Sequence, residues 1–308
     1  MFEEIEKYKS LDFFARQVVE GFITGLHKSP FHGFSVEFAE HRLYNAGEST
    51  RHIDWKLFGR TDKLFVKRYE EETNLRCAVA LDCSSSMLYP LDRHACFPDR
   101  PNKLTFSVYA AALLIELLER QRDAFSLVTF TDNLDLQTDM RSSTTHQRHL
   151  YALLQQLLSA APQQPTGKPT DVATCLHQLA EQLHRRSVVV VFTDAMSRDD
   201  DREALFDALR HLRHNKHEVL LFHVTEGDTE RDFHFDNRPY EFVDMETGER
   251  VKLFPQEVAE AYRRRRAETD EDLRRHAMQY KIDYVEVDTT KGFEQVMLPF
   301  LLKRSRHY

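Results

Sequence analysis

The sequence predicts an α/β fold: a doubly wound, mostly parallel sheet, preceded by a helix and a small β-rich module. Two observations carry this prediction. After about residue 74, apolar runs of strand length alternate with amphipathic runs of helical length, which is typical of parallel strands covered by helices. One of these runs, 187–192 (SVVVVF), is a string of β-branched residues, as expected for a strand with both faces covered.

The first 74 residues follow a different pattern. Apolar residues at helical spacing from Leu11 to Leu26 predict a helix, and a Lys-Ser-Pro triplet ends it. The segments that follow are short, aromatic-rich and separated by Gly, Asn and Asp, which is typical of strands joined by turns. We therefore expect two parts, a helix with a β-rich module in residues 1–74 and an α/β domain in residues 75–308.

The elements of the α/β domain are assigned in order from their apolar patterns. The segment Lys103–Arg120 is apolar on nearly every face, so we expect it to be a buried central helix. The expected strands are 75–81, 124–130, 134–137 as a short edge strand, 187–192, 218–224 and 283–287, with a hairpin of 240–243 and 250–253. The other expected helices are 146–159, 171–183, 200–213, 256–280 and 293–303.

Composition narrows the class of protein. With 41% apolar and 30% charged residues, the 308-residue chain is globular rather than disordered or fibrous. The net charge of -8 argues against nucleic acid as a partner, because phosphate binding relies on an excess of Lys and Arg. No apolar run reaches the roughly 18 residues of a membrane span, and the acidic N-terminus is unlike a secretory signal. We therefore expect a soluble cytoplasmic protein without a transmembrane segment, with its four cysteines reduced.

Three loops at one edge of the predicted sheet carry the candidate functional residues. In such sheets, ligands bind at the carboxyl ends of the strands, where the loops converge. Asp82 follows the first strand of the α/β domain, Asp194 follows the run 187–192, and Thr170 precedes the helix that begins near residue 171. The resulting set of hard oxygen donors is Asp82, Ser84, Ser86, Thr170 and Asp194.

This donor set suits Mg²⁺, with Mn²⁺ or Ca²⁺ as other hard dications. Such an ion prefers oxygen ligands, and Mg²⁺ in particular keeps some of its waters. The Asp-x-Ser-x-Ser pattern places a carboxylate and two hydroxyls in one turn, where alternate side chains can face one centre, and Ser85 is expected to point away. With few anionic ligands the ion would stay electrophilic and accept a carboxylate from a partner.

Other interpretations of the same stretch are weaker. A serine nucleophile on an α/β sheet expects Gly-x-Ser-x-Gly, and no glycine flanks these serines. A phosphate-binding loop is suggested by the Gly-Lys pair of residues 166–170, but the first glycine is missing and a proline replaces an amide donor. A simple cap of a turn or helix start stays open, although the matching positions of Thr170 and Asp194 favour the ion site.

The residues resemble two known groups of proteins. The strand followed by Asp-x-Ser-x-Ser, the later Pro-Thr-Asp loop and the still later Phe-Thr-Asp resemble the von Willebrand factor A domain, a Rossmann-type fold, with its metal-ion-dependent adhesion site. Residues 29–72, which contain the block RHIDWK, resemble the signature of the bacterial DUF58 family. Two departures are Glu48, where the family more often has aspartate, and a longer loop at 88–103 beside the proposed site.

The resemblance implies a non-enzymatic, divalent-metal-dependent protein-binding module. It implies that the ion is bound by Asp82, Ser84, Ser86, Thr170 and Asp194. Such proteins are commonly encoded beside MoxR-type AAA+ ATPases, which implies that ATPase as a partner in chaperone-like assembly or maturation of a client protein. The alternative is a metal-dependent hydrolase that uses the same carboxylates, but no histidine lies within the three loops to act as a base.

Three further groups of polar residues need an interpretation. The RHIDWK block with its flank either docks a partner or ties the β-rich module to the main domain; its residues are Arg51, Asp54, Trp55, Lys56 and Arg60. The run Arg263–Arg266 is expected on a solvated, salt-bridged helix face. His211, His214 and His217 are expected to be exposed polar residues.

Overall fold

The structure is a computed structural model. It describes residues 10–27, 41–43, 58–60, 64–67, 75–91, 101–160, 171–195 and 199–305. The chain divides into two compact units, one of Met1–Phe22 with Leu75–Tyr308 and one of Ile23–Asn74. The domain limits expected from the sequence, 1–74 and 75–308, stay a prediction.

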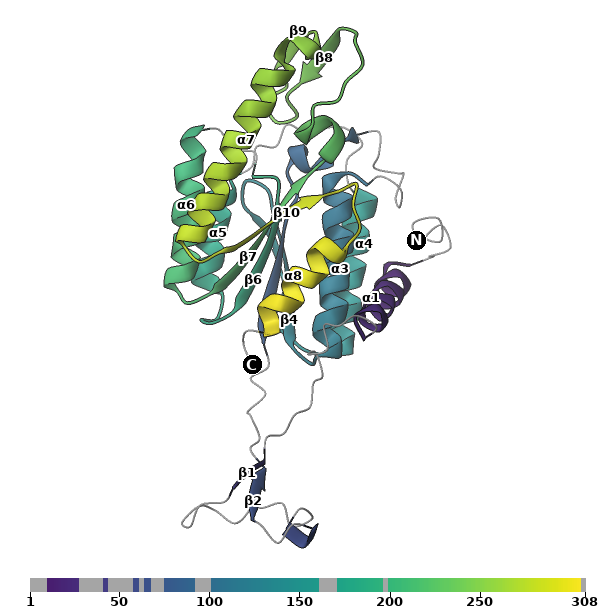
Figure 1. Cartoon of the computed structure of the whole chain (residues 1–308), viewed down its shortest axis with the longest axis vertical. Coiled ribbons are helices and arrows are strands. Elements are labelled where there is room, and N and C mark those ends of the chain that lie inside the picture. The colour runs from purple at the N-terminus through teal and green to yellow at the C-terminus, as the bar shows by residue number, and fades with distance from the viewer. Residues whose placement is uncertain are drawn as a thin grey trace. The chain divides into compact units, whose positions relative to one another are not determined.

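A six-stranded sheet forms the centre of the larger unit (Figure 1). Its strands are β3 (Arg76–Asp82), β4 (Ala124–Phe130), β5 (Leu134–Gln137), β6 (Val188–Thr193), β7 (Glu218–Thr225) and β10 (Asp283–Asp288). Their order across the sheet is β10-β7-β6-β3-β4-β5, and only the edge strand β5 is antiparallel to its neighbour. Counted along the chain, this is the 3-2-1-4-5-6 order of doubly wound folds. The predicted fold class is therefore confirmed.

Helices cover both faces of this sheet, as Figure 1 shows. They are α1 (Leu11–His27), α3 (Lys103–Arg120), α4 (Thr144–Ala160), α5 (Val172–Gln182), α6 (Asp199–His214), α7 (Pro255–Gln279) and α8 (Glu294–Ser305). The helices α5, α6 and α7 share one apolar cluster with the sheet, to which they contribute Leu179, Leu209 and Leu273. On the other side α1 packs on α3 and the start of α8, because the ring of Phe14 lies 4.8 Å from that of Tyr109 and 5.7 Å from that of Phe293.

Strand β6 shows why the run 187–192 lacks polar alternation. All six of its residues are buried. Val189 and Val191 belong to the cluster under α5, α6 and α7, and side chains alternate along a strand, so Val190 and Phe192 face the opposite layer. The Phe192 ring there stacks on that of Phe222, with centroids 4.9 Å apart. The prediction of a strand covered on both faces is confirmed.

Helix α3 spans the residues predicted for the buried central helix. The side chain of Asn102 caps its first turn by accepting a hydrogen bond of 2.7 Å from the Thr105 amide. Its residues are buried almost continuously from Lys103 to Leu118. The helix therefore carries a lysine into the protein interior at its amino end, which lies at the carboxyl edge of the sheet.

An insertion between β7 and β10 extends beyond the sheet (Figure 1). It contains a π-helix, η5 (Gly227–Arg231), the hairpin β8 (Tyr240–Val243) with β9 (Arg250–Leu253), and the long helix α7. The hairpin and the helix agree with the sequence prediction, whereas the π-helix was not predicted. Aromatic rings hold the insertion together, since Phe233 stacks on Tyr262 at 4.3 Å and contacts Phe235 at 5.0 Å.

The smaller unit contains a two-stranded antiparallel ladder. Its strands are β1 (His41–Leu43) and β2 (Phe65–Lys67), which agree with a β-rich module in the part that is described. In the candidate docking block, Arg51, Asp54, Trp55 and Lys56 lie outside the described residues, and Arg60 is exposed. The two interpretations of this block, a surface that docks a partner and a tie between the module and the main domain, therefore both stay predictions.

Two expectations about polar residues are wrong. Arg266 is only 9% exposed, because α7 turns it toward the sheet, where it pairs with Asp270; its neighbours Arg263 to Arg265 are exposed as expected. His217 is fully buried in the short connection between α6 and β7, directly before the strand begins. Of the expected reduced cysteines, Cys77, Cys83 and Cys175 are free.

Candidate metal centre

The candidate centre lies where the strand order of the sheet reverses. From β3 the chain continues to β4 on one side, whereas β6 lies beside β3 on the other. In doubly wound folds a crevice opens outside the carboxyl ends of such a strand pair. Asp82 is the last residue of β3, and Asp194 directly follows β6. The fold thus brings these two predicted ligands to one place.

The Asp82 carboxylate is fixed by two hydrogen bonds. Its Oδ1 accepts from the Ser84 amide at 2.9 Å, and its Oδ2 accepts from the Thr193 hydroxyl at 2.7 Å. The side chain has no exposed surface. Burial and the nearby negative charge of Asp194 raise the pKa of Asp82 to about 7, against the opposing effect of the two hydrogen bonds. A bound dication would relieve both unfavourable effects.

Ser84 and Ser86 present their hydroxyls side by side. A short 3₁₀ turn, η3 (Ser85–Leu88), follows Ser84 and brings the two Oγ atoms to 3.1 Å from each other. Octahedral Mg²⁺ has ligand distances of about 2.1 Å, so adjacent ligands lie about 3.0 Å apart. The two hydroxyls are hydrogen-bonded to each other, and their spacing would also suit two neighbouring ligands of such an ion. Thr170 lies outside the described residues, so its predicted role stays a prediction.

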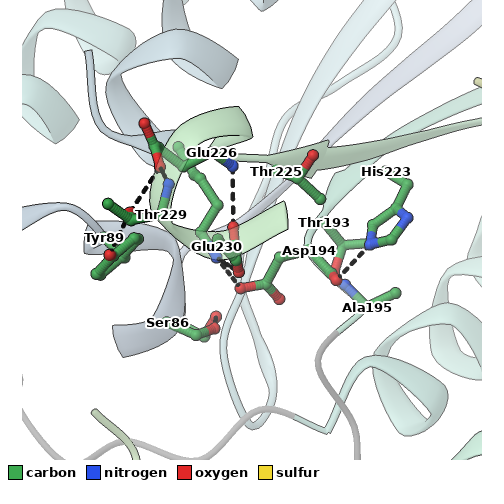
Figure 2. Close-up of polar contacts among 12 residues, drawn as sticks. Ser86, Tyr89, Thr193, Asp194, Ala195, His223, Thr225, Glu226, Thr229 and Glu230 are labelled. Atoms are coloured by element: carbon green, nitrogen blue, oxygen red, sulfur yellow. Dashed lines mark hydrogen bonds and ion pairs between the residues drawn. The ribbon is translucent and has the colours of Figure 1, made fainter. Parts of the chain in front are cut away.

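Lys103 is a part of the site that sequence reasoning missed. Its Nζ donates to Oδ2 of Asp194 at 2.7 Å and to Oε1 of Glu230 at 2.8 Å. Figure 2 shows Asp194 and Glu230 turned toward the same point. Burial disfavours the ammonium, but the two carboxylates more than compensate and raise the pKa of Lys103. The one signal in the sequence is a lysine at the first position of a largely apolar helix.

The π-helix η5 closes the site on the side of Glu230. The Glu226 amide donates to Oε2 of Glu230 at 2.9 Å, and Oε2 of Glu226 accepts from the amide and hydroxyl of Thr229 at 2.7 Å each. The hydroxyl of Thr229 in turn bonds to that of Tyr89, which directly follows η3 (Figure 2). The inserted segment is thus hydrogen-bonded to the loop that carries the serines.

A histidine also lies beside the site, although none lies in the three predicted loops. His223, in β7, contacts the carbonyl oxygen of Asp194 through Nε2 at 2.8 Å and the Tyr284 hydroxyl through Nδ1 at 2.7 Å. Burial and the Arg266 guanidinium lower the pKa of His223 to about 3. Because the ring stays neutral and both nitrogens have partners, His223 supports the loop after β6 rather than supplying a base.

The residues present fit a hard divalent ion. The Asp82 carboxylate accepts hydrogen bonds from the Ser84 amide and the Thr193 hydroxyl, and no Lys, Arg or His of the described residues forms an ion pair with it. Two carboxylates and two convergent hydroxyls are the oxygen donors that such an ion prefers. In the part of the chain that the structure describes, no group of three or more His, Cys, Asp or Glu side chains forms an alternative metal cluster.

The family of the chain follows from its sequence. The family described as "Protein of unknown function DUF58" matches residues 40–276, which is more than half of the 308 residues. The chain therefore belongs to the DUF58 family. Its larger unit has the α/β architecture expected of a von Willebrand factor A-like domain. No helix of the described residues combines the length and the hydropathy needed to cross a membrane.

Among the curated proteins, the chain is similar to uncharacterized proteins of Mycobacterium bovis and Mycobacterium tuberculosis. The identity is 24% over 186 residues, which are 60% of this chain and 55% of each relative. The chain thus spans about half the length of the curated relatives it matches. These similarities say nothing about an activity.

Three solved structures show a distant likeness. The conserved hypothetical protein BatB of Bacteroides thetaiotaomicron has a TM-score of 0.48 and 14% identity, covering 76% of this chain and 100% of its own. An aerotolerance-related membrane protein of Bacteroides fragilis has a TM-score of 0.44 and 16% identity, covering 72% of this chain and 96% of its own. The mussel byssus protein PTMP1, with a zinc-occupied MIDAS motif, has a TM-score of 0.36 and 13% identity, covering 50% of this chain and 38% of its own. Likenesses at this level carry no argument about function.

Proposed function

We propose that this protein is a non-enzymatic, divalent-metal-dependent protein-binding module. The observation that carries the proposal is the buried carboxylate of Asp82, which has hydrogen-bond donors but no cationic partner in the described residues. It lies next to a second carboxylate and two hydroxyls with the spacing of neighbouring metal ligands. Asp82, Ser84, Ser86 and Asp194 would hold the ion, with Thr170 as a further ligand from a loop outside the described residues.

When bound, the ion would supply a Lewis-acidic position that takes a carboxylate from another protein. The protein's own residues orient this position. Thr193 and the Ser84 amide fix the direction of the Asp82 carboxylate, and η3 fixes the two serine hydroxyls beside it. The side chains of Asp82 and Asp194 are both buried, so neither is fully hydrated. Mg²⁺ is the ion we expect, with Mn²⁺ as its closest substitute.

Binding is favoured over hydrolysis because, apart from the carboxylates proposed to hold the ion, the described residues lack a suitable base near the centre. His223 is neutral and has partners for both ring nitrogens, and Lys103 holds its proton between two carboxylates. General-base catalysis needs a group that can accept a proton near neutral pH within reach of the substrate. A metal-dependent hydrolase stays the alternative, and turnover of a phosphoester or peptide that Asp82→Asn abolishes would establish it.

For the partner we propose a MoxR-type AAA+ ATPase, together with a client protein that offers the carboxylate. Support for this partner comes from the resemblance to DUF58 proteins encoded beside such ATPases. It is tested by co-purification of the ATPase with wild-type protein and with Asp82→Asn, each with Mg²⁺ and with a chelator. Equal recovery in all four samples would leave the partner standing and remove the ion from the interaction.

The ion itself is tested by titration calorimetry with Mg²⁺ and Mn²⁺. Wild-type protein is expected to bind one ion, and Asp82→Asn is expected to bind none. The substitution keeps the side-chain shape and an acceptor for the Ser84 amide, so the fold is retained. Ser85→Ala is the matched control, because Ser85 lies in the same turn and is expected to point away from the ion. Absence of heat for both ions with the wild type would refute the proposal.

A further inference from the structure

Lys103 lies in the site but is not one of the proposed ion ligands. Its side chain is 1% exposed, and its ammonium lies within 2.8 Å of two carboxylates from different parts of the chain. One of them, Asp194, is a proposed ion ligand. The other, Glu230, comes from η5, which belongs to the inserted segment.

The ammonium occupies a position from which it competes directly with an ion. It donates a charge-assisted hydrogen bond to Oδ2 of Asp194, so that this oxygen is already paired with a cation. Asp82, in contrast, has no such partner among the described residues. An ion at this site would therefore find one carboxylate available and one shared.

Glu230 holds the ammonium in this position. Its Oε1 accepts the second hydrogen bond of Lys103, and its Oε2 accepts from the Glu226 amide, so the carboxylate is itself fixed. Tyr262 of α7 also donates a 2.8 Å hydrogen bond to the Glu230 carbonyl oxygen. A lysine held from two sides cannot turn away from Asp194 without leaving a buried charge unpaired, which is strongly unfavourable.

We propose that Lys103 is a specificity-determining residue of the ion site: by sharing Asp194 with the ion, it makes tight ion binding depend on an acidic ligand from the partner. This inference rests on the proposed function, since it concerns the same site. Mg²⁺ in proteins is commonly bound by one or two carboxylates together with oxygens of the ligand. With Asp194 engaged by Lys103, the missing negative charge is supplied by the ligand.

The test compares Mn²⁺ affinities of wild-type protein and the double variant Lys103→Met/Glu230→Gln, each with and without acetate as a small carboxylate. The double variant removes one positive and one negative charge, so its net charge is unchanged. Because Glu230 is also replaced, no carboxylate at that position is left buried without a cation, as it would be in Lys103→Met alone. Circular dichroism confirms that it is folded. Arg120→Met is the matched control, because it breaks an ion pair with a buried glutamate at the far end of the same helix.

We expect the double variant to bind Mn²⁺ about tenfold more tightly than wild type without acetate, the size typical of changes in groups that contact a metal ligand. Acetate should tighten binding to wild type and to Arg120→Met, but have little effect on the double variant. If, without acetate, only the double variant bound Mn²⁺ measurably, the inference would be strongly supported. Equal affinities and equal acetate effects would overturn the inference and leave the ion site standing, whereas no binding by any protein would refute the ion site and the inference together.

Discussion

The two edges of the central sheet bury polar groups in different ways. At the amino edge, Asp123 accepts a 3.0 Å hydrogen bond from the Leu75 amide, and Ser187 donates one of 2.6 Å to the His184 carbonyl. At the carboxyl edge, Asp82 and Asp194 are buried near each other, and their repulsion contributes to the raised pKa of Asp82. At the amino edge, polar groups thus form hydrogen bonds that join chain segments, whereas the carboxyl edge contains two carboxylates that repel each other. Unfavourable buried charge of this kind is more common at functional sites than elsewhere in a protein.

The largest effect is expected from Lys103→Met alone. It leaves the carboxylates of Asp194 and Glu230 buried without their cation, and breaking a buried pair in this way costs about 3–5 kcal/mol of unfolding free energy. Denaturant unfolding in the presence of a chelator measures it. The double variant with Glu230→Gln should recover part of the loss. A loss below about 1 kcal/mol would show that the carboxyl edge is less charged than the structure indicates.

The second effect has the opposite sign. Asp82→Asn removes a buried carboxylate whose pKa is raised, so it should increase the unfolding free energy at pH 8 without metal by about 1–2 kcal/mol. The sign follows from proton binding. Between pH 4 and 7 the folded state holds a proton on Asp82 that the unfolded state has lost, so wild-type stability falls as pH rises through this window. Mg²⁺ should stabilise the wild type alone. A decrease in stability for Asp82→Asn would contradict the comparison.

Asp123→Asn makes the same substitution at the amino edge and sharpens the comparison. The amide oxygen can still accept the hydrogen bond from the Leu75 amide, so a change of at most about 1 kcal/mol is expected, toward lower stability. Thermal unfolding with and without Mg²⁺ should show no ion-dependent difference from wild type. If Asp123→Asn stabilised the protein as much as Asp82→Asn, the two edges would not differ in the way described.

The smallest effect concerns pH at the amino edge. Burial lowers the pKa of His217, so the unfolded state binds the proton more readily and wild-type stability falls as pH drops below about 6.5. His217→Leu removes this contribution, and its unfolding free energy should fall less steeply between pH 6.5 and 5, by less than about 1 kcal/mol over that range. Parallel pH profiles for the two proteins would show that His217 is hydrated in the folded state.

Much of the fold was predictable because each element carries its own pattern. The bounds of α3 and of the hairpin β8–β9 agree with those expected, since apolar periodicity and a Gly-containing turn are local signals. The neighbouring positions of Asp82 and Asp194 were predictable too, because parallel strands end at a common edge. The element bounds and the positions of these two aspartates could therefore be predicted without knowing any contact between distant segments.

The parts that escaped prediction depend on such contacts. Lys103 and Glu230 are 127 residues apart, and nothing local to either one indicates the other. The π-helix that positions Glu230 has no sequence pattern of its own. Arg266 and His217 were expected to be exposed because their neighbours are polar, but a helix against a sheet and a tight connection bury them. Whether such a polar residue is buried depends on segments that are distant in the sequence, so its immediate neighbours do not indicate it.

The insertion between β7 and β10 divides into a part that could be exchanged and a part that could not. The hairpin β8–β9 lies beyond the sheet, and its Phe242 packs on Phe235 of the segment that leads into it. η5 instead anchors Lys103 through Glu230. A recombinant protein could therefore receive the hairpin of another member of the family in place of the segment between Arg231 and Pro255, while the residues of the proposed ion site are left unchanged. The hairpin could then be varied without rebuilding the domain that carries it.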